Sequence, residues 1–200
     1  MKFTLLLIIA IIDFSYSKNS PTTEEVKLWT YLRGRLHFSE ECTASLMGNL
    51  YAESGLKSGS YDIAYHQELG LTDSEYVRQV NKGQYSKDKF INDNIGFGLA
   101  QWRDSNKKQG LYQLCHGKIG DLVCQVSYIE EEITSNLDSD IYNKLKTTKT
   151  ISKCNFFLIN YYFKNYSLSS DEENRRIQFA EVFYEIYVKK NIDMIKNYPL

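Results

Sequence analysis

The sequence predicts a mainly helical protein of the α+β class, with a small β-sheet early in the chain. Apolar residues recur at the helical period of 3.6 over several segments, and most of these segments begin at a capping residue. A stretch near residue 97 breaks this period with two glycines. The chain has 200 residues, of which 42% are apolar, so it can bury a core as one domain.

The first seventeen residues are expected to be a secretory signal and not part of the fold. Residues 3–12 are almost wholly apolar, and Ser15 and Ser17 fit the small-x-small pattern of a cleavage site. The apolar run is too short to span a bilayer. Asp13 favours the alternative, an uncleaved anchoring or amphipathic helix. We expect a single domain over residues 18–200 that stays out of the membrane once the signal is removed.

Two helices are expected at the start of this domain. Thr22 and Glu25 form a capping box that opens a helix reaching about Leu36. Ser39 can cap a second helix, which Gly55 ends. The apolar positions of the second helix follow the helical period: Cys42, Leu46, Met47 and Leu50.

The middle of the chain has the weakest helical pattern. Residues 57–92 are polar and rich in Tyr, with one further capping box from Thr72 to Glu75. A short strand or hairpin is expected over residues 90–102, where glycines allow the backbone to bend or to approach a ligand. The glycines of this stretch are Gly96 and Gly98. Three or four helices should follow, including apolar stripes at 119–133, 151–162 and 175–188.

The chain contains four cysteines, an even number that fits disulfide formation in an oxidising compartment: Cys42, Cys115, Cys124 and Cys154. Three pairings are possible. One of them joins Cys115 to Cys124 across a short loop and leaves Cys42 to pair with Cys154. A zinc site is the alternative, but the spacings do not resemble paired CxxC motifs. We expect no metal and no organic cofactor.

Two further sequence features limit the function. The formal net charge is −1 and no basic stripe is present, which argues against nucleic-acid binding. Asn165-Tyr166-Ser167 is an N-glycosylation sequon, usable only in a eukaryotic secretory route.

Glu53 is the side chain that points most directly to catalysis. It follows Leu50 by three residues and therefore falls on the apolar face of its helix, close to the end. Desolvation at such a place raises the pKa of a carboxyl and keeps it protonated. A protonated carboxyl can give its proton to a leaving oxygen, as glycoside cleavage requires. The alternative is a helix-end Glu that forms a salt bridge.

Several short motifs around Glu53 resemble known enzymes. The stretches GNLYAESG at 48–55 and GFGLAQW at 96–102 resemble motifs of goose-type lysozymes and soluble lytic transglycosylases. The fuller resemblance is to the phage tail lysozyme family. It adds LGLTDSEY at 69–76, Asp93, and IGDL at 119–122 followed by Gln125. The likeness runs from about residue 22 to 190, and its specificity lies in the order and spacing of the motifs.

The resemblance implies a lysozyme-like fold in which Glu53 is the general acid. Asp93 is expected either to orient water and steady positive charge on the sugar, or simply to cap a turn. Asp62 and Glu68 are lesser alternatives for the second carboxylate. The residues expected to contact substrate are Ser54, Gly96, Gly98, Gln101 and Trp102. For Trp102 a place in the core is an equal alternative to stacking on a sugar.

The expected function is that of a secreted lysozyme-like glycoside hydrolase. It would act as a monomer on peptidoglycan strands, outside the cell or in a lysosomal or phagosomal lumen, for bacterial lysis, digestion or defence. It would cut the β-1,4 bond between N-acetylmuramic acid and N-acetylglucosamine. Four alternatives remain: a lytic transglycosylase, a module that binds peptidoglycan without cleaving it, a structural part of a tail or wall, and, more remotely, a chitinase.

Overall fold

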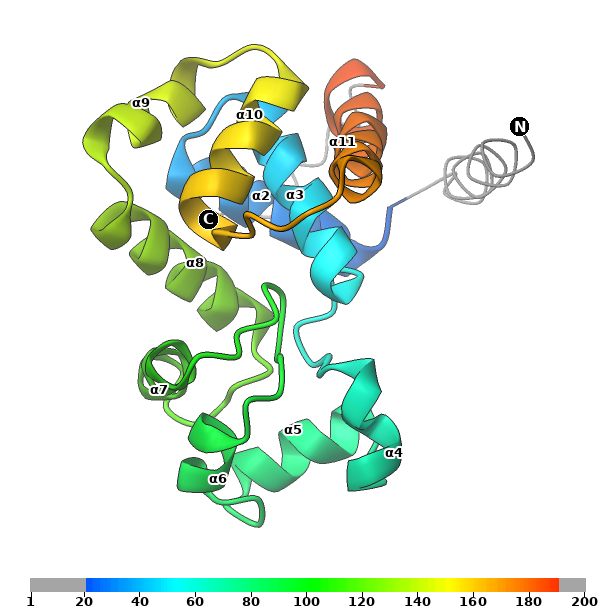
Figure 1. Cartoon of the computed structure of the whole chain (residues 1–200), viewed down its shortest axis with the longest axis vertical. Helices are drawn as coiled ribbons and strands as arrows, with labels where there is room; N and C mark the ends of the chain where they lie inside the picture. The colour runs from blue at the N-terminus through cyan, green and yellow to red at the C-terminus, as the bar shows by residue number, and fades with distance from the viewer. Residues whose placement is uncertain (1–20, 191–200) are drawn as a thin grey trace, which may run out of the picture.

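The computed structural model describes residues 21–190, so the expected signal at 1–17 lies outside the described residues. Two groups of helices make up this part of the chain (Figure 1). The first contains α2 (Thr23–Leu36), α3 (Glu40–Ser54), α9 (Ser139–Thr147), α10 (Ile151–Phe157) and α11 (Ser170–Tyr184). The second contains η1 (Ile63–Tyr65), α4 (His66–Leu69), α5 (Asp73–Asn81), α6 (Lys87–Asn92) and α7 (Ser105–Leu114). The helix α8 (Leu122–Asn136) runs between the groups.

Two of the helices continue as π-helical turns. The segment η2 (Leu158–Phe163) extends α10, and η3 (Glu185–Lys189) extends α11. No helix in the range 21–190 has the length and apolar character needed to cross a membrane.

The predicted starts and ends of the first two helices are confirmed. Thr22 and Glu25 form the capping box of α2, which ends at Leu36. The Ser39 side chain caps α3, and Gly55 ends it with a left-handed φ of 62°. The second predicted capping box, at Thr72, opens α5. These signals are local in sequence, which is why they could be predicted without knowledge of the tertiary structure.

The predicted small β-sheet is wrong for the described part of the chain. Between residues 21 and 190 there are no strands, only isolated bridges that join Phe97 to Tyr61 and to Trp102. The stretch folds back on itself at once, because Gly98 and Gln101 both have left-handed φ values, 73° and 49°. The beginning of the predicted strand belongs instead to α6, whose N-terminus is capped by a serine.

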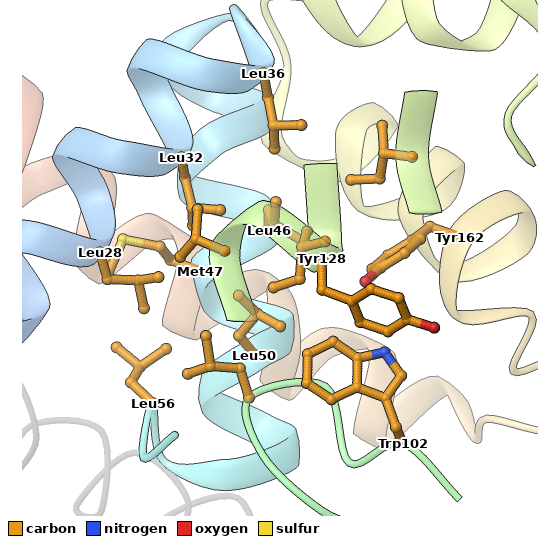
Figure 2. Close-up of a cluster of buried hydrophobic side chains, with 14 of the residues drawn as sticks. Leu28, Leu32, Leu36, Leu46, Met47, Leu50, Leu56, Trp102, Tyr128 and Tyr162 are labelled. Carbon is orange, nitrogen blue, oxygen red and sulfur yellow. The ribbon is translucent and has the colours of Figure 1, made fainter. Parts of the chain in front are cut away.

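The helix α3 packs at the centre of the first group, and its closest neighbour is α11. Gly48 makes the approach possible, since a Cβ there would lie 2.7 Å from both Ala180 N and Arg176 O of α11. Figure 2 shows the other side of α3, where leucines and a methionine of α2 and α3 pack together, with Trp102, Tyr128 and Tyr162 at one edge.

All four cysteines are in disulfides. Cys42–Cys154 joins α3 to α10, and Cys115–Cys124 joins the end of α7 to α8. The pairing that closes a short loop is therefore the one the fold adopts, and the remaining pair links helices 112 residues apart in sequence.

Candidate active site

A cleft of about 320 Å³ lies at the C-terminal end of α3. Glu53 lines it together with the turn that follows residue 99, the start of α7 and the end of η2. Of the catalytic and substrate-contacting residues predicted from sequence, the cleft brings together Glu53, Gln101 and Trp102. Ser54, Gly96, Gly98 and Asp93 are not among its lining residues.

Glu53 is half-buried, with 22% of its side chain exposed, and it forms an ion pair at the cleft. Its Oε1 accepts a hydrogen bond from Arg176 Nη2 at 2.7 Å. Among the described residues the hydrogen bonds to this carboxyl reach Oε1 only. The salt bridge that the sequence argument set against catalysis is thus present, but the same carboxyl also borders an open cavity.

Arg176 is buried and binds three partners from α3 and α11. Its guanidinium donates to Glu53, to Asn49 Oδ1 at 3.1 Å and to Glu172 Oε1 at 3.3 Å. Asn49 is itself fully buried and donates to Asn155 Oδ1 on α10. One guanidinium therefore joins two carboxylates and fixes the orientation of Glu53 through a network that reaches into the core.

Arg176 was not among the residues predicted from sequence, and it lies 123 residues from Glu53. Its place depends on the close crossing of α3 and α11 at Gly48. The glycine stands within the GNLYAESG motif, and a glycine in mid-helix is a signal of close backbone approach. That signal alone does not identify the partner helix.

Asp93 lies away from the cleft in a closed hydrogen-bonding cluster. Its carboxyl accepts from Tyr76 Oη at 2.8 Å, from Tyr85 Oη at 3.0 Å, from the Ile95 backbone N–H at 2.9 Å and from Lys108 Nζ. The side chains of Asp93 and Lys108 are both buried. The Ile95 contact is the turn-capping bond that the sequence argument kept as its alternative.

Burial shapes the protonation of the groups around Asp93. It raises the pKa values of the Tyr76 and Tyr85 hydroxyls, and the Asp93 carboxylate adds to that effect. Burial also lowers the pKa of the Lys108 amine, although Asp93 beside it acts in the opposite direction. The cluster is a buried ion pair with each charge hydrogen-bonded, which is what a structural role requires.

The side-chain amide of Gln125 holds the turn over residues 96–102 by hydrogen bonds to the backbone. The Gln125 Oε1 accepts from Leu99 N at 2.8 Å, and its Nε2 donates to Ser58 O and Ile119 O. Gly98 passes so close to this amide that a Cβ would lie 2.7 Å from its oxygen. The Ser54 hydroxyl, at the end of α3, lies 3.0 Å from Leu99 O. Ser54 and Gly98 thus fix the turn beside Glu53 and do not line the cleft.

Gln101 and Trp102 each have a structural contact as well as a place at the cleft. The Gln101 Nε2 donates to Gly98 O at 3.1 Å, so this amide supports its own turn. Trp102 is buried, donates from Nε1 to Glu132 Oε2 at 2.8 Å and packs edge-on against Tyr128 (Figure 2). Most of the Trp102 side chain is therefore packed in the core, which was the alternative to stacking on a sugar.

A second carboxylate lines the cleft that the sequence argument did not single out. Asp104 caps α7, with its Oδ1 accepting from the backbone of Asn106 at 2.9 Å, and it remains exposed. Asp62 is ion-paired with the cleft residue Arg103 but does not line the cavity itself. Burial acts to raise the pKa of Asp62, yet the Ala64 N–H and the Arg103 guanidinium outweigh it and lower that pKa.

Comparison with known protein families gives a match over most of the chain. The family described as phage tail lysozyme matches residues 23–187, from the start of α2 into η3. This range includes every described residue that lines the cleft. No curated protein and no solved structure matches the chain.

Proposed function

The chain belongs to the phage tail lysozyme family, and we propose that it cleaves the β-1,4 bond between N-acetylmuramic acid and N-acetylglucosamine in peptidoglycan. Membership of the family implies a lysozyme-like glycosidase that acts on peptidoglycan. The specific bond is our proposal. The observation that carries it is the position of Glu53, a carboxyl at a helix end that borders an open cleft and is oriented by Arg176.

In this proposal Glu53 gives its proton to the oxygen of the departing sugar. Arg176 binds Oε1, which leaves Oε2 to face the substrate. A glycan chain that fills the cleft excludes bulk water from the reaction and brings the glycosidic oxygen to the open side of the carboxyl. While Glu53 carries the proton that it gives up, Arg176 keeps Glu172 as a partner for its charge.

Water completes the reaction by attacking the sugar after the bond breaks. We propose Asp104 as the acid that holds this water, because it is exposed in the same cleft. Asp93, which the sequence favoured for this task, lies in a closed cluster with its oxygens already bonded.

A lytic transglycosylase is the second function to consider. In that reaction a hydroxyl of the sugar itself replaces water, so no second acid is needed. The capping bond of Asp104 to the α7 backbone supports this alternative, since it occupies part of that carboxylate. Mass spectrometry of the released fragments separates the two, because the anhydro product is lighter by one water.

We also propose that the protein acts outside the cytoplasm, as a monomer with one catalytic domain over residues 18–200. Two disulfides suit an oxidising compartment such as the cell exterior or a lysosomal or phagosomal lumen. A role in bacterial lysis, digestion or defence follows from that location and from the proposed substrate.

The proposal is tested by Glu53→Gln, which keeps the shape of the side chain and an oxygen for Arg176. Clearing of a peptidoglycan suspension should fall by roughly a hundred- to ten-thousandfold, because the general acid is lost. Glu68→Gln is the matched control, since Glu68 is exposed and not in the cleft. Clearing by a folded Glu53→Gln protein at the wild-type rate would remove the assignment. Tight sedimentation of the wild type with peptidoglycan and no released fragments would indicate a binding module.

A further inference from the structure

The sequon Asn165-Tyr166-Ser167 lies in an accessible loop. It is the only Asn-x-Ser/Thr motif without proline in the 200 residues. The loop, 164–169, joins η2 to α11, and Tyr166 within it is 74% exposed. An enzyme that modifies folded or folding chains can therefore reach it.

The side chains of the sequon are arranged for modification of the amide nitrogen. The Ser167 Oγ lies 3.4 Å from Asn165 Oδ1, so the hydroxyl can donate to the amide oxygen. The hydrogen bonds that the described residues make to this amide reach only that oxygen. The nitrogen Nδ2, the atom that carries an N-linked sugar, keeps its protons uncommitted.

Asn165 also lines the same cleft as Glu53. Its neighbours Phe163 and Lys164 belong to the same wall. Because the cavity measures only about 320 Å³, a sugar attached at its wall occupies the space that a substrate chain needs.

We propose that N-glycosylation of Asn165 closes the Glu53 cleft, so that the glycosylated protein is a latent form. The donor is an oligosaccharide linked to a polyprenyl diphosphate. A bond forms between Asn165 Nδ2 and C1 of the first sugar while the bond from C1 to the diphosphate oxygen breaks. The amide loses one proton, and the polyprenyl diphosphate leaves with the bonding electrons.

The attached sugar acts by competition as well as by bulk. A short tether gives it an effective concentration in the millimolar range. The first sugar of N-linked chains is an N-acetylated hexosamine, the same chemical class as the substrate. This last step rests on the proposed function, whereas blockage of the cavity does not.

The test uses the full chain secreted from a eukaryotic host that performs N-glycosylation. The wild type is compared with Ser167→Ala, which removes the sequon and leaves Asn165 in the cleft. A matched control adds Gln84→Asn to Ser167→Ala, which recreates Asn-Tyr-Ser at an exposed turn outside the cleft. Intact mass reports the glycan, and clearing and sedimentation with insoluble peptidoglycan report access to the cleft.

The wild type should carry one glycan and clear peptidoglycan at least about tenfold more slowly than Ser167→Ala. Enzymatic release of the glycan should restore the rate, and the glycan at residue 84 should leave it unchanged. An unmodified wild type, equal rates for the wild type and Ser167→Ala, or an equal loss in the relocated control would each overturn the inference.

Failure of the proposed function gives a different result. In that case Ser167→Ala also releases no fragments, and sedimentation decides the inference. Binding by Ser167→Ala but not by the glycosylated wild type supports closure of the cleft. Equal binding by both, or binding by neither, contradicts it.

Discussion

The surroundings of Glu53 and Asp93 show two uses of a carboxylate paired with a buried cation. At Glu53, Arg176 binds one oxygen and the other side of the carboxyl meets the cleft. At Asp93, Lys108, two tyrosines and a backbone amide surround the carboxyl in a buried cluster. Both acids lie within the residues that the family matches, but only Glu53 borders an open cleft. Both carboxylates have a buried cationic partner, so the difference between them is that Glu53 borders a cleft and Asp93 does not.

The largest difference should appear in stability when each acid becomes an amide. Asp93→Asn leaves the buried Lys108 charge without its partner, so the free energy of unfolding should fall by about 3–5 kcal/mol. Glu53→Gln should lower it by less, about 1–2 kcal/mol, because the buried Arg176 keeps Glu172 as a charge partner and the new amide oxygen can still accept its hydrogen bond. Denaturant titration measures both. A stable Asp93→Asn protein that no longer clears peptidoglycan would return Asp93 to the catalytic assignment.

High pH should weaken the Asp93 cluster. Tyr76 and Tyr85 have pKa values raised in the fold, so the folded protein keeps their protons where the unfolded chain loses them. Stability is then fully present below about pH 10, the ordinary tyrosine value, and falls above it. Each tyrosine contributes about 1.4 kcal/mol per pH unit. Denaturation midpoints from pH 9 to 11 measure the loss, and Tyr85→Phe should reduce it. If Tyr85→Phe leaves the dependence of the denaturation midpoint on pH unchanged, the loss of stability at high pH does not come from this cluster.

A smaller effect is expected at the cation that orients Glu53. Arg176→Lys keeps the charge but loses the guanidinium fork, so the maximal clearing rate should fall on the order of tenfold with little change in half-saturation. Arg175→Lys is the control, since Arg175 is exposed and forms its ion pair with Glu172 and not with Glu53. A shifted pH profile in Arg176→Lys, absent in the control, identifies a positioning role. Loss of stability without any change in rate or profile would argue for structure alone.

The sequence predicted those features whose causes are local. Helix caps and the apolar period gave the bounds of α2 and α3, and they placed Glu53 at a helix end. The β-sheet was wrong because glycines in a short apolar stretch fit both a strand and a left-handed turn. Arg176 could not be predicted, since its contact depends on how α11 crosses α3.

The two disulfides lie close to the helices that border the cleft. Cys42 is in α3, which carries Glu53, and Cys154 is in α10, whose extension η2 forms the opposite part of the lining. If a protease cut the chain once between Cys42 and Cys154, the two fragments would stay joined through this disulfide. A molecule cut once in this way therefore keeps Glu53 and the opposing wall of the cleft in one covalently linked unit.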